Sequence, residues 1–314
     1  MISSNKIILV GLGRIGYKGF PETHYQCAIK NKLNVIAGID SSPQARSRFV
    51  TETGIPAYES LDGLPEEFWS SFFTVATSSE ASFSTIKKLL TKDGPLGILV
   101  EKPFCEDASQ SEEILSLQKT TNIPMRVNYS RQYSKSMPLI KSLITKDKLL
   151  SGVVIYSSGL RENGSHFIRM ICGLFPSINP ATDIICLDES RFRIRITGGA
   201  EIDFIPLESP HLHNSEIRLV FGEILISISE GLKIEIRKVN THSPMRLWPR
   251  ELELIFEGSF SDGFESSYLD QEWWRASRQD YIFQELTLDH LCNLIIEAAL
   301  GSTTKSKNGV ENDD

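Results

Sequence analysis

Short apolar runs alternate with longer amphipathic stretches along the first part of the chain. The apolar runs have the length of buried strands and lie at residues 7–10, 35–39, 72–76, 98–100 and 125–128. Stretches of helical length lie between them, at residues 15–30, 44–52, 83–90 and 108–119. This order predicts a doubly wound α/β domain, in which helices cover both faces of a parallel sheet.

The pattern changes after residue 128. Residues 182–237 alternate between β-branched and polar positions, with glycine-containing turns between the runs, which is typical of an antiparallel sheet. Stretches at 138–144, 166–173 and 286–300 have helical spacing. We therefore expect a first domain at residues 1–127, an α+β domain with a large open, mostly antiparallel sheet at 128–302, and a flexible tail at 303–314.

The charge balance indicates which class of ligand the protein binds, and the cysteines indicate its redox compartment. Among 314 residues, 33 Lys and Arg stand against 40 Asp and Glu, so the formal net charge is −7. We expect no nucleic-acid or membrane partner, and a small molecule becomes the expected ligand. The five cysteines form no C-x-x-C pair, so the sequence indicates neither a disulfide framework nor a zinc cluster. This pattern favours a protein of the reducing cytoplasm. The longest early apolar run, Ile7–Leu12, is too short to span a membrane.

A glycine-rich motif, G-L-G-R-I-G at residues 11–16, follows the first expected strand and opens the first expected helix. In this context Gly11 permits the tight turn, Gly13 lets a pyrophosphate approach the backbone, and Gly16 lets helix and strand pack closely. Amides at the helix N-terminus favour the anion, and Arg14 is expected to contact it. The alternative is a tight turn that binds nothing.

Asp40 stands at the end of the second expected strand, 24 residues after Gly16. A carboxylate in this position accepts hydrogen bonds from a ribose diol and repels a 2'-phosphate, so the sequence favours NAD. NADP stays an alternative because Ser41, Ser42 and Arg46 lie close by in the sequence. A further alternative is that Asp40 only caps the next helix.

The triplet Glu101-Lys102-Pro103 follows the expected strand 98–100. This places Lys102 at the carboxyl end of a parallel sheet, where ligands of such folds bind. A lysine there could hydrogen-bond a substrate hydroxyl and stabilise the negative charge that develops on its oxygen. A solvated lysine without a ligand is the alternative.

These motifs resemble those of the Gfo/Idh/MocA family of sugar-type oxidoreductases. The resemblance rests on the glycine-rich motif, on the triplet at 101–103, on Gly164-Ser165-His166, and on the stretches 128–131 and 159–168. It implies a Rossmann domain that binds NAD or NADP, a second domain that holds a pyranose-like substrate, and a homodimer or homotetramer formed through the second sheet. The run 159–168 is similar to the branch found in surface-polysaccharide and nucleotide-sugar pathways.

The resemblance also implies roles for particular residues. Lys102 and His166 would form the catalytic pair, in which the histidine takes the proton of the reacting hydroxyl and the lysine polarises its oxygen. Glu162 joins them as a residue that could bind a substrate hydroxyl. Cofactor contacts are expected from Gly11, Gly13, Arg14, Ile15, Gly16, Asp40, Thr77, Ser78, Glu101, Lys102 and Pro103. Substrate contacts are expected from Asn128, Arg131 and Asn163.

The chain departs from the family pattern around this expected site. Glu162 replaces an Asp or Asn four residues before the histidine, and Arg169 replaces an Asp three residues after it. In the loop after the strand 72–76, Ser78 replaces a proline and Ser82 replaces a histidine that faces the cofactor. These departures would suit a shifted substrate, or a protein that has kept the fold and lost turnover.

Three functions follow from these observations. The first is hydride transfer between NAD(P) and the secondary alcohol or ketone of a sugar or nucleotide sugar. The second is a catalytically quiet protein that senses a dinucleotide or a sugar, and the third is an NAD-dependent glycosidase without net redox change. No metal is expected, since His211 and His213 lack nearby Cys or Asp ligands. The pair Trp273-Trp274 is left open between a sugar contact and a packing role.

Overall fold

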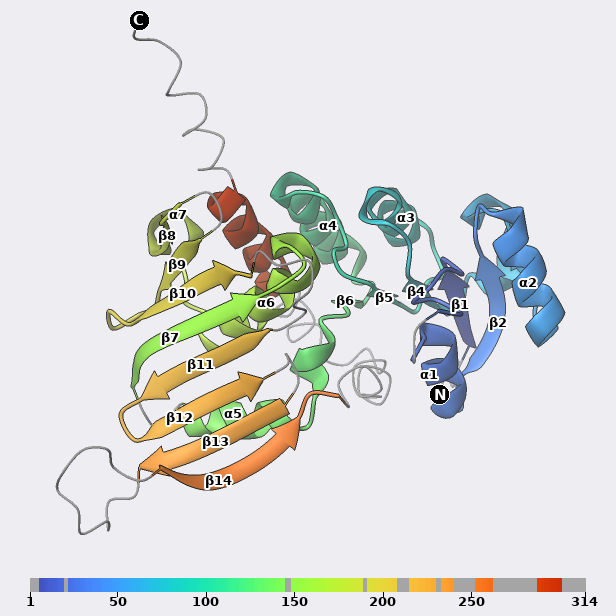
Figure 1. The fold of residues 1–314 in the computed structure, drawn as a ribbon. Coiled ribbons are helices and arrows are strands. Elements are labelled where there is room, and N and C mark those ends of the chain that lie inside the picture. The colour runs from blue at the N-terminus through green and yellow to red at the C-terminus, as the bar shows by residue number, and fades with distance from the viewer. Residues whose placement is uncertain are drawn as a thin grey trace, which may run out of the picture. The chain divides into compact units, whose positions relative to one another are not determined.

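The computed structural model describes most of the chain in two sheets with their helices (Figure 1). The residues it describes are 6–19, 22–144, 148–188, 191–207, 215–229, 233–239, 252–261 and 287–300. The expected tail, the pair His211 and His213, and Trp273-Trp274 lie outside these residues. Contacts divide the described chain into two units: residues up to Tyr129 with 287–290, and residues 130–261 with 291–300.

The first unit contains a six-stranded parallel sheet in the order β3-β2-β1-β4-β5-β6. Its strands are β1 (Lys6–Val10), β2 (Asn34–Ile39), β3 (Ala57–Tyr58), β4 (Phe72–Val75), β5 (Gly97–Val100) and β6 (Met125–Val127). Side chains of the central strands, such as Ile8, Phe73 and Leu99, are fully buried, as expected for a sheet covered on both faces. The doubly wound fold class predicted from the sequence is confirmed.

Among the described residues, the helices of this unit that connect its strands are α1 (His24–Lys30), α2 (Pro43–Thr53), α3 (Ser79–Thr91) and α4 (Ala108–Thr121). Two short 3₁₀ helices, η1 (Leu61–Gly63) and η2 (Glu66–Phe68), precede β4. Polar side chains cap α2 and α4: Ser42 accepts from the third amide of α2, and Asp107 accepts from the third amide of α4. α2 ends at Gly54, whose φ of 72° places it in the left-handed region that glycine favours.

The first helix is shorter than the sequence predicted. A helix was expected over 15–30, but the residues after the glycine motif form a turn, and α1 begins at His24 behind the capping residue Thr23. Gly19 has a φ of 144°, which no helical residue adopts. The helix resumes in register, since the amides of His24 and Tyr25 donate to the carbonyls of Ile15 and Gly16 at 2.9 Å and 3.0 Å.

The second unit contains an eight-stranded sheet in the order β14-β13-β12-β11-β7-β10-β9-β8. Its strands are β7 (Leu149–Tyr156), β8 (Ile184–Cys186), β9 (Phe192–Arg195), β10 (Glu201–Pro206), β11 (Glu216–Phe221), β12 (Ile224–Ser229), β13 (Lys233–Val239) and β14 (Leu252–Ser259). Every pairing is antiparallel except that of β10 with β7. The mostly antiparallel sheet predicted from the sequence is confirmed.

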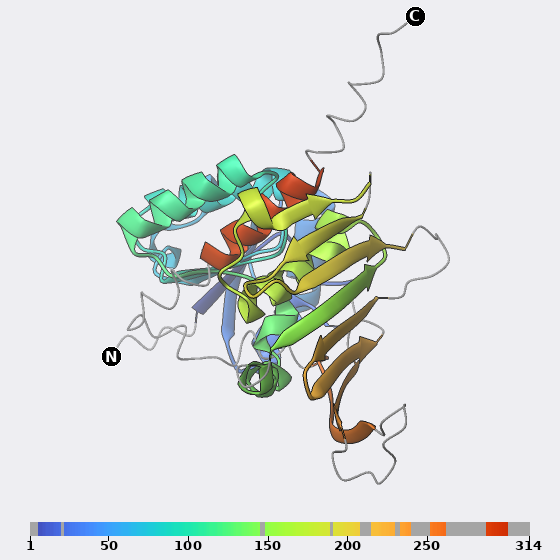
Figure 2. The same cartoon turned by 90° about the vertical axis from the view of Figure 1, so that its left-hand side faces the viewer.

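One face of this sheet is buried and the other is open. Along β11, Ile217 and Leu219 are fully buried, while Arg218 and Val220 between and beyond them are exposed. The strands form one twisted layer (Figure 2). The helical elements of this unit are η3 (Ser130–Tyr133), α5 (Ser136–Ile144), η4 (Leu160–Gly164), α6 (Ser165–Leu174), α7 (Pro180–Asp183) and residues 291–300. Within the described residues, no helix is both long and apolar enough to cross a membrane.

Candidate functional site

The glycine motif forms the tight turn between β1 and the first helical residues. Gly11 has a φ of 94°, and a Cβ atom there would lie 2.4 Å from the carbonyl oxygen of Ala76. A Cβ atom on Gly16 would lie 1.9 Å from the carbonyl oxygen of Gly11. Side chains are therefore excluded at both positions by the closeness of the neighbouring backbone.

Gly13 is different, because no atom lies within 4 Å of the place where its Cβ would be. The residue is exposed, as is Arg14, while Ile15 is half-buried. One helical turn starts here, since the Tyr17 amide donates to the Gly13 carbonyl at 3.0 Å. The first amides of such a turn point outward and favour an anion, so the open space at Gly13 fits a diphosphate.

Asp40 fastens this turn to the next helix. One carboxylate oxygen accepts from the Leu12 amide and the other from the Ser42 amide, both at 2.8 Å. A carboxylate has about four lone-pair sites, so each oxygen can still accept from a ribose hydroxyl. Asp40 therefore shapes the turn and also presents negative charge beside it.

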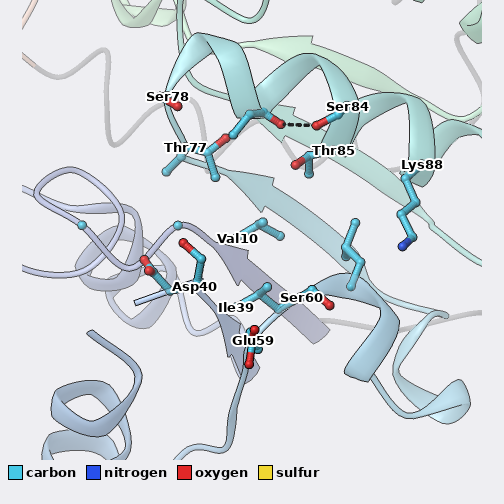
Figure 3. Close-up of a pocket in the computed structure, with 16 residues that line it drawn as sticks. Val10, Ile39, Asp40, Glu59, Ser60, Thr77, Ser78, Ser84, Thr85 and Lys88 are labelled. Carbon is cyan, nitrogen blue, oxygen red and sulfur yellow. Dashed lines mark hydrogen bonds between the residues drawn. The ribbon is translucent and has the colours of Figure 1, made fainter. Parts of the chain in front are cut away.

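A cavity of about 520 Å³ lies over the carboxyl ends of β1, β2 and β4 (Figure 3). Five of the expected cofactor residues line it: Gly11, Gly13, Asp40, Thr77 and Ser78. Ser41, Glu59, Ser60 and Lys88 line it as well, with Asp40 and Lys88 toward opposite sides in the view of Figure 3. The structure thus brings together residues that the sequence expectation drew from three separate segments.

Ser82, which stands where the family pattern has a histidine, is fully buried in α3. Its hydroxyl lies 2.9 Å from the Thr77 hydroxyl, so the two side chains are hydrogen-bonded. Ser78 precedes α3 and is exposed. In this chain Ser82 therefore positions Thr77, which in turn lines the cavity.

Glu101, directly after β5, joins three elements of the first unit. Its Oε1 lies 3.0 Å from His24 Nε2 of α1 and 2.6 Å from Asn128 Nδ2, just after β6. An ionised carboxylate only accepts hydrogen bonds, so His24 carries its proton on Nε2. The other oxygen, Oε2, accepts from the backbone amide of Lys102 at 3.2 Å. The peptide bond between Lys102 and Pro103 is cis.

Burial makes this arrangement rigid. The His24 side chain has no exposed surface and that of Glu101 is 13% exposed. Asn128, which the sequence analysis expected at the substrate, is 2% exposed and donates to Glu101. The Glu101 carboxylate that accepts from the Lys102 amide is consequently held by α1 and by the residue that follows β6. His24 was not foreseen from the sequence, because its partner lies 77 residues away.

In the second unit, His166 is the second residue of α6 and is half-buried. A π-helical turn leads into α6: the amides of Asn163 and Gly164 both donate to the Gly159 carbonyl, at 3.2 Å and 3.1 Å. Gly159 has a φ of 83°. Such π-turns occur frequently at functional sites.

Glu162 is exposed and bends back over this turn. A Cβ atom on Gly159 would lie 2.2 Å from the Glu162 carboxylate oxygen Oε2, so the glycine makes room for this carboxylate. Asn163 donates from Nδ2 to the Ser215 hydroxyl at 2.8 Å, which ties the turn to the segment before β11. Glu162 is therefore placed by the glycine that starts the turn.

Arg131 of η3 packs against α6. Its guanidinium carbon lies 4.7 Å from the centre of the Phe167 ring, a cation–π contact. Burial lowers the pKa of Arg131 to about 10, so the side chain still carries its charge at neutral pH. Arg169, on the next turn of α6, is 2% exposed. Arg169 thus lies three residues after His166 on α6, and Arg131 contacts Phe167, the residue that follows His166.

A sequence model described as the oxidoreductase family with an NAD-binding Rossmann fold, Gfo/Idh/MocA, matches residues 5–129. Residues 5–129 are therefore similar to the NAD-binding Rossmann domain of Gfo/Idh/MocA oxidoreductases. The match covers the whole parallel sheet and the turn, carboxylate and triplet described above. The family resemblance and the NAD cofactor inferred from the sequence are confirmed.

Solved structures share the fold of the oxidoreductase over nearly the whole chain. A levoglucosan dehydrogenase in complex with NADH and levoglucosan has a TM-score of 0.72 at 13% identity, covering 96% of this chain and 97% of that one. A UDP-N-acetylglucosamine 3-dehydrogenase from Acidithiobacillus ferrooxidans has a TM-score of 0.69 at 9% identity, with 94% and 98% covered. A dehydrogenase from Chromobacterium violaceum has 0.70 at 11%, with 96% of each chain covered.

At these identities the likeness concerns the fold. No curated protein sequence matches this chain. The described residues hold no group of three or more His, Cys, Asp or Glu side chains that could bind a metal ion. The features that fit NAD are therefore those of the first unit itself, namely the open space at Gly13, the remaining lone pairs of Asp40, and the cavity that joins them.

Proposed function

We propose that this oxidoreductase transfers a hydride between NAD(P) and the secondary alcohol or ketone of a sugar or nucleotide sugar. One observation carries the proposal: the cavity lined by the glycine turn and Asp40 lies at the same sheet edge as Lys102, which follows β5. Two of the solved structures that share the fold are named as dehydrogenases of sugar-type molecules, which supports the same substrate class.

The first unit provides the cofactor side of the reaction. The turn amides beside Gly13 would bind the diphosphate and Asp40 the adenosine ribose. When bound, the nicotinamide supplies the acceptor or donor of the hydride. Glu101, held by His24 and Asn128, fixes the backbone of Lys102, so that the lysine ammonium would meet the reacting oxygen in one position.

We assign the proton transfer to His166. In the oxidising direction the C–H bond of the alcohol breaks and the hydride leaves, while the O–H proton passes to the imidazole and a C=O bond forms. Lys102 would stabilise the developing negative charge on that oxygen. Arg131, Glu162 and Asn163 are proposed to bind other hydroxyl or anionic groups of the substrate, because all three lie on the segments that surround the start of α6.

We further propose that the protein acts in a reducing cytoplasm, in a surface-polysaccharide or nucleotide-sugar pathway. All five cysteines are free thiols, four of them buried, which is compatible with that compartment. Two or four copies would associate through the open face of the eight-stranded sheet. The exposed apolar side chains on this sheet, among them Val220, Leu252 and Leu254, support that association.

The test is a titration with NADH and NADPH, followed by absorbance at the nicotinamide band with a panel of sugars and nucleotide sugars. Binding with a change in absorbance is expected. Lys102→Ala and His166→Ala should each lower kcat by about 10²–10⁴-fold with little change in cofactor affinity. Binding without turnover would favour the sensor, and release of a free sugar with NAD unchanged would favour the glycosidase. Absence of binding would overturn the proposal.

A further inference from the structure

A second carboxylate faces the cavity beside Asp40. Glu59 comes directly after β3, its side chain is 78% exposed, and it lines the same cavity as Asp40, Ser41 and Ser60 (Figure 3). β3 pairs with β2, and the Asp40 amide donates to the Tyr58 carbonyl at 3.1 Å. The two acids are therefore held next to each other by the backbone of adjacent strands.

The neighbouring arginine is already engaged. Arg46 Nη1 donates to the carbonyl oxygens of Asp40 and Ser41, at 2.7 Å and 2.9 Å. Its Nη2 lies 3.8 Å from Glu59 Oε2, within ion-pair distance. Arg46 is the first cation in the sequence after the end of β2, and an arginine near this strand end can accommodate the 2'-phosphate of NADP. Here its donors point to two carbonyls and to Glu59.

We propose that Glu59 is a second determinant of nucleotide choice, which makes the oxidoreductase prefer NAD(H) over NADP(H). This inference rests on the proposed cofactor role of the cavity. A 2'-phosphate would bring about two negative charges to a place that already holds Asp40 and Glu59. Glu59 acts twice: its carboxylate repels the phosphate, and it lies within ion-pair distance of Arg46, a cation that could otherwise compensate for the phosphate charge.

Glu59 and Asp40 differ in whether their carboxylates also hold the backbone. Asp40 accepts two backbone amides and cannot be changed without loosening the glycine turn. Glu59 is exposed and holds no backbone group among the hydrogen bonds of the described residues, so its charge can be removed with the fold intact. Nucleotide preference can thus be tested at Glu59 without disturbing the site.

The experiment is a fluorescence titration of the full-length protein with NADH and with NADPH. For Glu59→Gln, we expect the Kd for NADPH to fall about 3- to 10-fold and the Kd for NADH to change less than about 2-fold, since one charge near the surface has a modest effect. Glu67→Gln is the matched control, because Glu67 is exposed on η2 and does not line the cavity. It should leave both Kd values unchanged.

A second pair of variants tests the part played by Arg46. Arg46→Gln in the otherwise native chain should leave the NADPH affinity almost unchanged, because Glu59 lies within ion-pair distance of this arginine and offsets part of its charge. In the Glu59→Gln background, the same change should remove most of the gain in NADPH affinity. The gain should also shrink as the salt concentration rises, since exposed charges are screened.

The outcomes separate this inference from the proposed function. NADH binding by the native protein with an unchanged nucleotide ratio in Glu59→Gln would overturn the role of Glu59 alone. Equal effects of Glu59→Gln and Glu67→Gln would also overturn it, since net charge would then explain the shift. A native protein that prefers NADPH contradicts it directly. If the native protein binds neither nucleotide, the cofactor function fails and the selectivity fails with it.

Discussion

At the scale of single residues, Glu101 shows how buried hydrogen bonds position a neighbouring site residue. His24 and Asn128 donate to one of its oxygens, and the Lys102 amide donates to the other. Removing one donor would leave a largely buried carboxylate short of a hydrogen bond, which costs more than the bond itself contributes. We therefore expect changes at His24 to reach Lys102 although His24 contacts neither cofactor nor substrate in the proposed function.

His24→Leu should lower the free energy of unfolding by about 1.5–3 kcal/mol and lower kcat about tenfold, because Glu101 loses a donor. His24→Gln should restore most of kcat, since the glutamine amide can donate from nearly the same place as Nε2. The Kd for NADH should change little in both variants. Urea unfolding, NADH titration and turnover measure the three quantities, and a loss of kcat that His24→Gln fails to restore would contradict the positioning role.

A second residue-scale prediction concerns Tyr17, which is 7% exposed and donates to Glu52 at 2.7 Å. Burial, followed by the hydrogen bond to Glu52, raises the pKa of Tyr17 to about 12. The unfolded value is about 10, so the hydroxyl contributes fully below pH 10, and its contribution is lost as the pH rises through 12.

Tyr17→Phe should therefore lower the free energy of unfolding by about 1 kcal/mol below pH 10. The difference between native protein and variant should disappear between pH 10 and 12. Urea unfolding at pH 8, 10, 11 and 12 measures this difference in the free energy of unfolding. A difference that stays constant over this range would show that ionisation of Tyr17 does not destabilise the folded protein, which contradicts the raised pKa. Glu52→Gln serves as a control, since it should weaken the same pH dependence.

The expected cofactor residues that the sequence located are those that local spacing identifies. The glycine motif and Asp40 follow fixed strand ends, so the pattern located them and the structure places them around one cavity. Glu59 and His24 depend on pairings between distant segments, β3 with β2 and α1 with the end of β5. Nothing in the local sequence distinguishes Glu59 from other exposed acids, so only the structure identifies it.

At the scale of elements, the turn after β1 shows where hydrophobic spacing misleads. Apolar residues at helical intervals predicted one helix over 15–30, yet α1 covers only His24–Lys30. The sequence held a contrary signal, because Gly19 and Pro21 both disfavour a helix interior. The hydrogen bonds of Ile15 and Gly16 nevertheless continue to His24 and Tyr25, so the helix keeps its register across the interruption.

Substitution by alanine should have a different effect on stability at Gly16, the last glycine of the motif, than at Gly13, the middle one. Gly16→Ala places a methyl group 1.9 Å from the Gly11 carbonyl oxygen and should lower the free energy of unfolding by more than about 3 kcal/mol. Gly13→Ala meets no protein atom within 4 Å and should change stability by less than about 1 kcal/mol.

Gly13→Ala should instead raise the Kd for NADH at least about tenfold, because the methyl group would occupy the space that a diphosphate needs. Urea unfolding and NADH fluorescence distinguish the two effects. If Gly13→Ala bound NADH as tightly as the native protein, the diphosphate would lie elsewhere. If Gly16→Ala were as stable as the native protein, the close approach of helix and strand would be wrong.

At the scale of the whole molecule, the two sheets differed in how far they could be predicted. The alternation of strands and helices predicted the doubly wound parallel sheet, but neither its strand order nor the short strand β3. The alternation of polar and β-branched residues over 182–237 predicted strands, but it did not predict which strands pair with each other in the sheet. β7 lies in the middle of the second sheet, parallel to β10 and antiparallel to β11, and no local pattern encodes that position.

We predict that copies of the chain associate through the open face of the eight-stranded sheet. Light scattering should give a mass of two or four times 35.3 kDa for the native protein. Val220→Glu places a charge on the exposed face of β11 and should yield the monomer, whereas Val50→Glu, an equally exposed valine on α2, should not. A native monomer, or equal dissociation by both variants, would contradict association through this sheet.

The register that survives between Gly16 and His24 has a consequence for protein engineering. Nine residues separate each donor from its acceptor where a continuous helix has four, so the chain length here is independent of the geometry of the glycine turn. Lys18 lies on this stretch and is 60% exposed. We therefore expect that a fluorescent label attached to an exposed side chain of this stretch would leave the two hydrogen bonds, and with them the glycine turn, unchanged.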